Sequence, residues 1–574
     1  MAEIEAALGG PWPVSSCRDR SQRAVPVDGM CRRLAFPDGA ANDRHLDHGA
    51  GAEGNGSRIM TRKPLSDLDG RRFDVVVIGG GINGAAAAQK AAAAGYSVLI
   101  VDKSDFATGA TGRSGRLLHC GLRYFETENP VRYFMTHPGR FFEALRMARH
   151  GMRARHDLVS TTPSRTRPMT VLFPIFRGGP YKGWQADLAF RLFKSLAPGD
   201  VPLDYRRLAP DEALRNPLVA ALANKEAISS VASYTEYQID WPERLCVDSI
   251  LDAERMGAVA RNYTAASLGE IRDSGRAVNL TDMDDSGSSA TVYGDVVFCM
   301  SGIWIDEVLR TARPDMPQKS FGTKGASMVV RLPESCRDFG VATINSQHEP
   351  FYCIPWYRYH LIGPTETPFQ GDLDSVFADA DDMAFLLHEA RAILPGLNIE
   401  ASSVVYSWAG IRPLTFDPAM PKGKRSRELH DLGGDGLENV FAMTAGPVMT
   451  YRSAGDEVVT KLQRILPPSR EPTDHSYSPP PLAEGSNTAL LSDTDPSIRL
   501  GDVRRAVTAE HARTLMDVLY RRVGLGWRHE FTQAELEAAS QAMAPDLGWS
   551  EDHRRQAIET FRAEATRLFG ARTS

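Results

Sequence analysis

Four residues near the start of the patterned sequence have the types and spacing needed to bind phosphate and sugar groups. The stretch VVVIGGGING places Gly79, Gly81 and Gly84 between an apolar run that ends at Ile78 and a run rich in alanine. Glycines at this spacing permit a tight turn, close approach of the backbone to a pyrophosphate, and close packing of a helix on a sheet. Asp102 lies about 20 residues beyond the turn, where a carboxylate accepts hydrogen bonds from a ribose. These residues predict a dinucleotide site at a strand–turn–helix–strand unit.

The elements that must position this turn are partly local and partly distant in sequence. A strand ending at Ile78, a helix after Gly84 and a strand at 96–101 form the first unit. Apolar runs at 295–300 and 439–444 have the pattern needed to complete the same sheet. The glycine turn alone does not distinguish nicotinamide from flavin. A nicotinamide domain normally completes its sheet with a second local βαβ half, so the distant strands favour a flavin.

Composition excludes several classes of protein. The chain is 42% hydrophobic and 24% charged, as in an ordinary globular protein, and its net charge of -6 gives no reason to expect a nucleic acid partner. Its seven cysteines form no CxxC pair, which argues against a metal site and a disulfide scaffold and favours a reduced, cytoplasmic compartment. No apolar run is long enough to span a bilayer, so we expect any membrane contact to be peripheral.

Length and patterning predict several regions. At 574 residues the chain is too long for one hydrophobic core. Residues 1–70 lack periodicity, and we expect them to be disordered or to come from an over-extended reading frame, with Met60 as a natural start. Residues 467–500 are rich in proline and serine and are predicted to be a linker. Residues 501–574 have helical spacing.

Several further segments, taken in order, are similar to those of one enzyme family. The chain resembles the FAD-dependent glycerol-3-phosphate dehydrogenases of the aerobic, quinone-linked type from about residue 73 to residue 570. Each segment is short, but their order and spacing are hard to obtain by chance. The matching segments are DVVVIGGGINGAAAA, SGRLLHCGLRYFE, IDWPERL, KGASMVV, IPWYRYHLIGPTET, WAGIRPL, SRELHDL, TAGPVMTYR and DVLYRRVGLGW.

The resemblance implies an α/β fold with bound FAD. It implies a Rossmann-like FAD-binding domain and a β-sheet substrate-cap domain, as in glutathione reductase and D-amino-acid oxidase, followed by a C-terminal helical domain. It also implies oxidation of glycerol 3-phosphate to dihydroxyacetone phosphate by hydride transfer to flavin N5, with electrons passed to a quinone-type acceptor. The expected boundaries are 71–160, 290–310 and 400–466 for the FAD domain, and 161–289 and 311–399 for the cap.

The resemblance also implies roles for individual residues. Arg123, Arg412 and Arg427 match positions of the family's substrate pocket, and the alternative for each of them is a surface ion pair. Arg412 is the hardest to explain as a surface residue, because it lies in an apolar segment. His119 is a candidate for handling the hydroxyl proton, or it only packs near the flavin. The expected cofactor contacts, besides the glycine turn and Asp102, are Thr111, Ser114, Gly302 and Gly446.

Departures from the family pattern concentrate in the substrate half. Pro447 stands where the family has a pocket lysine, and proline supplies neither that charge nor an amide donor. Cys120 replaces a glycine and Ser327 replaces a histidine. These changes leave two alternatives open: an enzyme of the same fold acting on another polyol phosphate, a hydroxy acid or an amine, and a flavin-binding regulator without turnover.

The segment 181–196 predicts an amphipathic helix. Trp184, Leu188, Leu192 and Leu196 recur at intervals of four residues. Such a helix either covers the cap sheet or rests on the inner face of the cytoplasmic membrane near a quinone pool. Oligomeric state has no signal in the sequence.

Overall fold

The computed structural model describes residues 64–125, 130–196, 201–284, 287–420, 423–477 and 488–570. Most of the N-terminal segment 1–70, for which we expected disorder or over-extension, lies outside the described residues. Its last part forms a short 3-10 turn, Leu65–Leu68, whose two leucines are buried.

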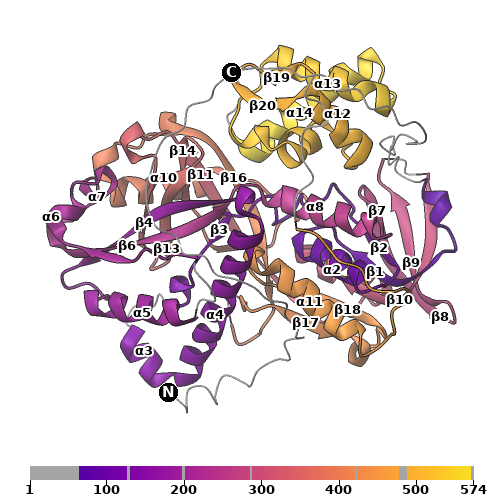
Figure 1. Ribbon diagram of the computed structural model, residues 1–574, viewed down its shortest axis with the longest axis horizontal. Helices are drawn as coiled ribbons and strands as arrows, with labels where there is room; N and C mark the ends of the chain where they lie inside the picture. Colours follow the sequence, from indigo (N-terminus) through magenta and orange to yellow (C-terminus); the bar gives the residue numbers. More distant parts are fainter. Residues whose placement is uncertain are drawn as a thin grey trace, which may run out of the picture. The chain divides into compact units, whose positions relative to one another are not determined.

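The first sheet is built around the glycine turn, and we call it the nucleotide sheet (Figure 1). Its strands are β1 (Arg72–Ile78), β2 (Val98–Val101), β7 (Val259–Arg261), β8 (Thr264–Arg272), β9 (Gly275–Asp282), β10 (Ser289–Cys299), β17 (Glu428–Asp431) and β18 (Val440–Thr444). Strands β18, β10, β1, β2 and β7 lie in that order and run parallel. Strand β17 and the hairpin β8–β9 add antiparallel pairings. The distant strands predicted to complete the sheet are confirmed as β10 and β18.

Small residues let helices pack closely on this sheet. The helices are α2 (Ile82–Ala93), α8 (Pro242–Arg255), α9 (Ile305–Ala312) and α11 (Tyr451–Leu462). Helix α2 contacts β1 and β2 and packs between α8 and α11. At Gly455 of α11, a Cβ would lie only 2.6 Å from the carbonyl oxygen of Ala86. The alanine-rich run therefore serves a three-helix layer against the nucleotide sheet.

The second sheet, which we call the cap sheet, is larger and mostly antiparallel. Its order is β15-β11-β14-β13-β12-β4-β6-β3, with β16 paired to β11 and β5 to β6. The bounds are β3 (Leu117–Leu118), β4 (Thr166–Phe176), β5 (Arg206–Leu208), β6 (Ile228–Ile239), β11 (Ser320–Val330), β12 (Phe339–Ile344), β13 (Pro350–Trp356), β14 (Tyr359–Gly363), β15 (Thr367–Pro368) and β16 (Val404–Thr415). The helices of this part are α3 (Pro130–Thr136), α4 (Pro138–Thr161), α5 (Gly183–Leu196), α6 (Pro210–Ala213), α7 (Pro217–Ala220) and α10 (Ala380–Ile393).

Some domain boundaries differ from those expected. Helix α8 and strands β7 to β9, within the predicted cap range 161–289, belong to the nucleotide sheet and its helical layer. Strand β16, within the predicted FAD range 400–466, pairs along most of its length with β11 of the cap sheet. Alternation of apolar residues identifies a strand, but it does not identify the partner of that strand.

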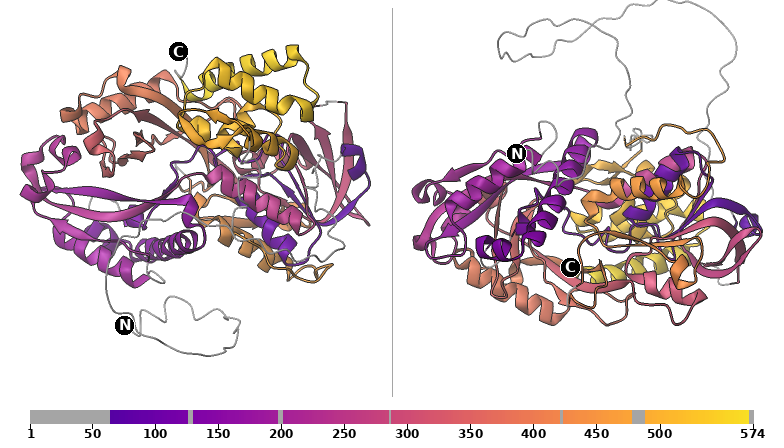
Figure 2. Two further views of the ribbon diagram at one scale, coloured as in Figure 1. Left: turned by 45° about the horizontal axis from the view of Figure 1, so that its top comes forward. Right: turned by 90° about the horizontal axis from the view of Figure 1, so that it is seen from below.

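The C-terminal part is helical, as predicted. It contains the hairpin β19 (Leu490–Ser492) and β20 (Asp495–Arg499), then α12 (Leu500–Ala509), the π-helical segment η11 (Asp517–Arg522), α13 (Gln533–Leu547) and α14 (Glu551–Phe569). The hairpin lies inside the predicted linker 467–500, of which 478–487 are outside the described residues. Figures 1 and 2 show these helices beside α8 and β16, and η11 contacts α8 while α14 contacts β16.

Buried ion pairs fasten this helical part to the nucleotide sheet. Arg522 donates to both carboxylate oxygens of Asp105, at 2.9 and 2.7 Å, and Arg521 donates to the same group at 2.5 Å. Burial acts to raise the pKa of Asp105, but the charges of Arg522 and Arg521 hold it well below its ordinary value. A second pair joins Arg244 of α8 to Glu510 at 2.6 Å. Removing one partner of such a pair leaves an uncompensated buried charge, so the contact is specific.

Among the described residues, no helix combines the length and the apolar character that crossing a bilayer requires.

Candidate functional site

A groove begins at the glycine turn and passes the N-terminus of α2; we call it the nucleotide groove. Its cavity has a volume of about 500 Å³. The groove lies where the parallel strands end, which is where ligands bind in open α/β sheets. Of the residues predicted to bind the cofactor, it is lined by Gly79, Gly81, Asp102, Thr111, Gly302 and Gly446.

Backbone packing explains two of the glycines. Gly79 has a φ of 114°, and a Cβ there would lie 2.6 Å from the carbonyl carbon of Met300. A Cβ on Gly84 would lie 1.9 Å from the carbonyl oxygen of Gly79. Helix α2 can therefore start this close to β1 only without side chains at these positions. Gly81, the N-cap residue of α2, lines the groove where the helix dipole favours an anion.

Asp102 and Thr111 are held by backbone amides. The Gly80 N–H donates to Asp102 Oδ2 at 2.7 Å, and the Ser104 N–H donates to Oδ1 at 2.9 Å. Burial raises the pKa of Asp102 to about 6, although the two amide hydrogen bonds act to lower it. Each carboxylate oxygen keeps a lone pair for a ribose hydroxyl. Thr111 Oγ1 accepts from the Ile82 N–H at 3.0 Å and so orders the start of α2.

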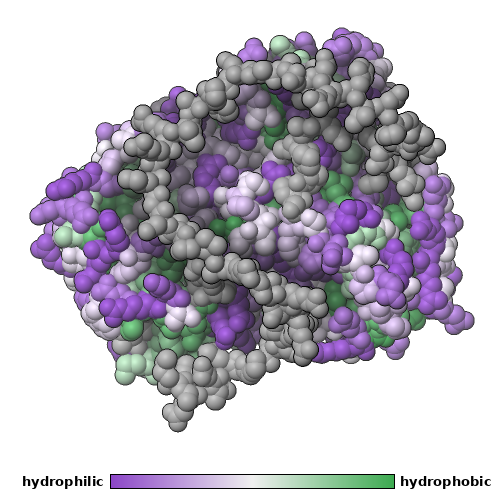
Figure 3. Space-filling view, viewed as in Figure 1, coloured by the Kyte–Doolittle hydropathy of each residue, from purple (hydrophilic) through white to green (hydrophobic). Residues whose placement is uncertain are grey.

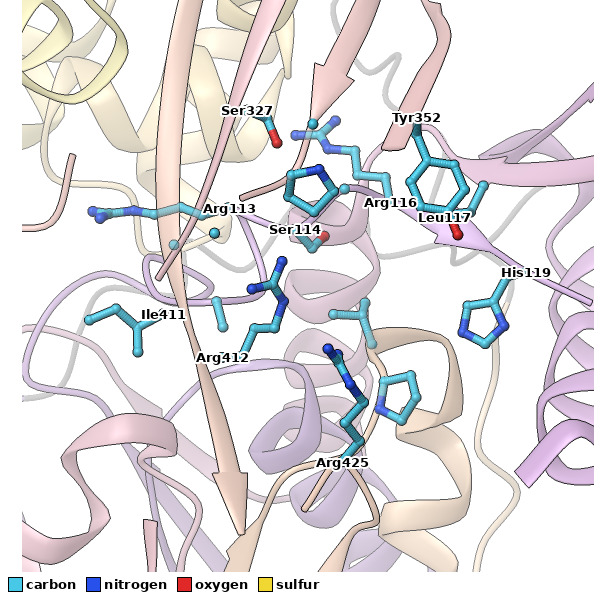
Figure 4. Close-up of a pocket in the computed structure, with 18 of the residues that line it drawn as sticks. Arg113, Ser114, Arg116, Leu117, His119, Ser327, Tyr352, Ile411, Arg412 and Arg425 are labelled. Atoms are coloured by element: carbon cyan, nitrogen blue, oxygen red, sulfur yellow. The ribbon is translucent and has the colours of Figure 1, made fainter. Parts of the chain in front are cut away.

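A second cavity, which we call the inner pocket, has a volume of about 230 Å³ (Figure 4). Its polar lining includes Arg113, Ser114, Arg116, His119, Ser327, Tyr352, Arg412 and Arg425. The lining residues that it shares with the nucleotide groove are Ala110, Arg113, Pro413, Ala445, Gly446 and Val448. The two cavities therefore adjoin each other, so that an elongated dinucleotide in the groove can place its reactive end beside the inner pocket.

Arg412 occupies the inner pocket as the sequence predicted for a pocket arginine. It lies on β16 opposite Thr323 of β11, and its guanidinium donates to the Thr365 carbonyl at 3.3 and 3.4 Å. Figure 4 shows the guanidinium directed into the cavity. Gly325 of β11 makes room for it, because a Cβ there would lie 2.5 Å from Arg412 Nη2.

A neighbouring arginine, Arg425, takes the place expected for Arg427. Arg425 lines the inner pocket beside Arg412, and it forms an ion pair with the buried carboxylate of Glu366. Arg427 is absent from the described lining of both cavities. Its guanidinium instead donates to Glu457 at 3.0 Å and to the Thr450 carbonyl at 3.0 Å. The segment before β17 is irregular, so sequence spacing did not fix which of its side chains faces the pocket.

The remaining predicted residues lie near β3. His119 follows this strand, is buried, lines the inner pocket, and meets the Tyr124 ring edge-on with centroids 5.2 Å apart. Ser114 lines the same pocket and donates to the Thr111 carbonyl at 3.2 Å. Arg123 lies in the 3-10 turn Leu122–Phe125, but its side chain is outside the described residues. The role expected of Arg123 stays a prediction.

The three departures from the family pattern lie in different places. Pro447 and Ser327 line the inner pocket, so these changes affect the substrate half directly. Cys120 is buried and is not among the described lining residues, and its N–H donates to Glu236 at 3.0 Å. Burial raises the pKa of the Cys120 thiol well above its ordinary value, which makes it unreactive.

Sequence reasoning missed Arg113, Arg116, Arg425 and Tyr352, all of which line the inner pocket. Arg116 pairs with buried Glu243 at 2.8 Å and lies 4.4 Å from the ring centroid of Trp527 in the C-terminal part. The available signal was the run TGRSGR, which begins at the predicted cofactor contact Thr111 and in which a glycine precedes each arginine. Arg425 had no comparable signal.

The lining of the nucleotide groove and the inner pocket fits a flavin dinucleotide. A helix N-terminus and a glycine turn suit a diphosphate, the buried carboxylate of Asp102 suits a ribose, and the inner pocket adjoins Gly446, where no side chain intervenes.

Comparisons with known proteins agree with this fit. A family profile described as FAD dependent oxidoreductase matches residues 74–452, and one described as C-terminal domain of alpha-glycerophosphate oxidase matches residues 478–554. The chain is 26% identical over 551 residues to a glycerol-3-phosphate dehydrogenase of Synechocystis sp., covering 86% of this chain and 96% of that protein. It is 26% identical over 407 residues to the aerobic glycerol-3-phosphate dehydrogenase of Bacillus subtilis, covering 70% and 69%.

The fold is also that of a solved structure. The X-ray structure of the glycerol-3-phosphate dehydrogenase from Bacillus halodurans complexed with FAD aligns with a TM-score of 0.65 at 20% identity, covering 88% of this chain and 96% of that one. The fold class and the cofactor predicted from the sequence are confirmed. The first profile spans both sheets and the second much of the C-terminal helical part, and the chain therefore belongs to the family of FAD-dependent oxidoreductases, with FAD as its cofactor.

Proposed function

We propose that the protein oxidises glycerol 3-phosphate to dihydroxyacetone phosphate. The observation that carries the proposal is the pair Arg412 and Arg425, which line an inner pocket adjoining the nucleotide groove. Planar guanidinium groups bind phosphate oxygens through two parallel hydrogen bonds, and enclosure strengthens such charge-assisted bonds. The names of the relatives support the same substrate.

The chemistry requires a hydride acceptor and a proton acceptor. FAD, when bound, supplies the acceptor for the hydride that leaves the secondary carbon of the substrate. The hydroxyl proton passes to His119, whose imidazole lines the same pocket and belongs to the residue type that titrates near neutral pH. Loss of the hydride and the proton leaves the carbonyl group of the product. Arg412 and Arg425 hold the phosphate, so that the carbinol carbon is presented to the mouth of the groove.

Apolar side chains of the cap sheet keep the reacting centre dry. Ile354, Leu361 and Ile411 line the inner pocket together with the arginines. Excluding water strengthens the electrostatic interactions inside the pocket and prevents side reactions.

The first test is reduction of the bound flavin under anaerobic conditions. Glycerol 3-phosphate should bleach the absorbance of oxidised flavin, while glycerol at the same concentration should not. Flavin that dithionite reduces but glycerol 3-phosphate does not would contradict the proposed substrate. Arg412→Ala should retain flavin and lose the bleaching, which also separates an enzyme from a flavin-binding regulator.

We further propose a quinone-type electron acceptor and peripheral membrane contact. Exposed hydrophobic side chains gather on α3, α4 and α5, and we call them the α3–α5 patch (Figure 3): Tyr133, Met135, Phe142, Trp184 and Leu188. Helix α5 buries Phe190 and Phe193 in the cap domain, so it does cover that domain, yet Trp184 and Leu188 remain 58% and 59% exposed. Exposed Arg132, Lys182, Arg191 and Lys194 complete a surface suited to anionic lipid headgroups.

Sedimentation with vesicles tests this surface. The holoenzyme should bind vesicles that contain anionic phospholipid, and the double variant W184S/L188S should bind several-fold less. Ile271→Ser is the matched control, because Ile271 is an exposed hydrophobic residue on β8 of the nucleotide sheet. Equal binding by all forms would contradict the membrane proposal. Reduction of a soluble quinone analogue without release of peroxide would support the proposed acceptor.

A second candidate substrate is favoured by the charge balance of the inner pocket. Arg425 is paired with Glu366 and Arg116 with Glu243, and Pro447 stands where the family has a lysine. This lining suits a substrate with less negative charge, such as a hydroxy acid or an amine, or else another polyol phosphate. A panel of these compounds in the bleaching experiment distinguishes the candidates, and peroxide released in step with substrate consumption would identify an oxidase.

A further inference from the structure

The nucleotide groove has a wall that comes from the far end of the chain. Glu564 and Arg567 of α14 line the same cavity as Gly81 and Asp102. They lie three residues apart and therefore share one face of the helix. Both residues follow the end of the C-terminal profile match at residue 554.

Packing fixes α14 in this position. Leu568 and Phe569, directly after Arg567, are buried, and the Phe569 ring stacks on Tyr520 with centroids 4.5 Å apart. Phe569 also meets Trp527 edge-on at 5.2 Å. The helix contacts β16, the strand that carries Arg412. Arg567 thus extends from a well-anchored helix end rather than from a loose terminus.

The groove is lined by three basic side chains, Lys103, Arg113 and Arg567, and by three acidic ones, Asp102, Asp374 and Glu564. Lys103 pairs with Asp374 at 2.7 Å, and Asp102 already accepts two amide N–H groups. Arg567 is exposed and forms no ion pair with any described residue. Arg113, which lines both cavities, donates to the Val376 carbonyl at 2.9 Å.

Two further positive charges, those of Arg521 and Arg567, lie near Arg113. Burial, together with the nearby positive charges of Arg521 and Arg567, lowers the pKa of Arg113 to about 10, while Glu564 acts to raise it. Positive charges gathered around a cavity attract an anion, and the diphosphate is the anionic part of FAD. Glu564 is the one lining carboxylate of α14 that opposes this effect.

We propose that Arg567 is a cofactor-binding residue, through which the C-terminal helical part closes the nucleotide groove and places positive charge against the FAD diphosphate. The cofactor site is then shared between the FAD-binding sheet and the last helix of the chain. FAD binding and docking of the C-terminal part stabilise each other, because a ligand stabilises the arrangement that binds it.

The test is the dissociation constant of FAD measured on apoprotein by quenching of flavin fluorescence. Arg567→Ala should weaken FAD binding roughly tenfold, and Arg567→Lys should weaken it less. Glu564→Gln should leave the affinity unchanged or tighten it up to about threefold, since it removes a negative charge from the groove. Arg562→Ala is the matched control, because Arg562 is exposed on the same helix but does not line the cavity.

ADP serves as a second probe because it carries the diphosphate without the flavin. Its affinity should fall in parallel with that of FAD in Arg567→Ala, and higher salt should narrow the difference between variant and parent. Equal FAD affinity in Arg567→Ala and Arg562→Ala would overturn the proposal, as would unchanged ADP affinity. If Arg567→Ala lowers the melting temperature of the apoprotein, Arg567→Gln, which keeps most of the side chain, decides between charge and packing.

Discussion

The nucleotide groove and the inner pocket share a wall, but they are built in different ways. The groove depends on backbone packing at the glycine turn, where Gly79 and Gly84 lie so close to other backbone atoms that a Cβ has no space. The inner pocket depends on side chains from β16, from the segment before β17 and from the end of β3. Backbone sterics leave one residue type per position, whereas a side-chain lining can change its charge without changing the fold. This difference explains why Pro447 is compatible with an intact cofactor site.

The largest effect is expected where the groove is tightest. Gly84→Ala should abolish FAD retention and destabilise the fold by about 3 kcal/mol, because its Cβ would lie 1.9 Å from the Gly79 carbonyl oxygen. The flavin-to-protein absorbance ratio and the melting temperature measure both effects. Gly139→Ala is the control, since no atom lies within 4 Å of a Cβ there. A Gly84→Ala protein that purifies with full flavin would show that the turn tolerates a side chain.

The next largest effect should fall on the inner pocket alone. Arg412→Ala should lower kcat/KM for the phosphorylated substrate by roughly 100- to 1,000-fold, since it removes a guanidinium directed into the pocket. Flavin content should stay unchanged. Arg412→Lys keeps the charge but loses the two-pronged geometry, so its kcat/KM should lie between those of the parent protein and of Arg412→Ala. Loss of flavin in Arg412→Ala would mean that the two cavities are not separable.

The pH dependence of stability and of FAD affinity tests the role of Asp102 in the groove. Burial raises the pKa of Asp102 to about 6, above the value of 3.8 expected in the unfolded chain. The folded apoprotein therefore binds more protons than the unfolded chain between about pH 4 and 6, and Asp102 makes its stability fall as pH rises through this range. FAD affinity should weaken below pH 6, as the carboxylate that accepts the ribose hydroxyl becomes protonated. Asp102→Asn should weaken FAD binding roughly tenfold and remove this pH dependence, and a retained pH dependence would assign it to another group.

The smallest effect concerns charge in the inner pocket. Pro447→Lys should lower KM for glycerol 3-phosphate roughly two- to fivefold and leave flavin content unchanged, because it adds a positive charge to the lining. Steady-state kinetics with glycerol 3-phosphate and with an uncharged polyol measure the effect. A gain of equal size for the uncharged polyol would show that shape, rather than charge, limits binding.

Local patterns predicted the groove well and the inner pocket only in part. The glycine turn, Asp102 and the strands β1, β2, β10 and β18 follow from apolar runs and spacing, because a βαβ unit constrains consecutive residues. Arg412 was predicted from the family resemblance, and its place in an apolar segment argued against a surface ion pair. Arg425 was missed and Arg427 was expected in its place, because two arginines separated by one residue in an irregular segment give no signal of direction.

The sequence by itself determined the dinucleotide turn, which depends on short-range sterics and periodicity, and its resemblance to a known family implied the fold class and the cofactor. Tertiary structure decided which strands belong to which sheet, which arginines face the inner pocket, and that Arg567 closes the nucleotide groove. These features arise where segments hundreds of residues apart come together. Their positions depend on packing and on buried ion pairs such as that between Asp105 and Arg522, which no local pattern specifies.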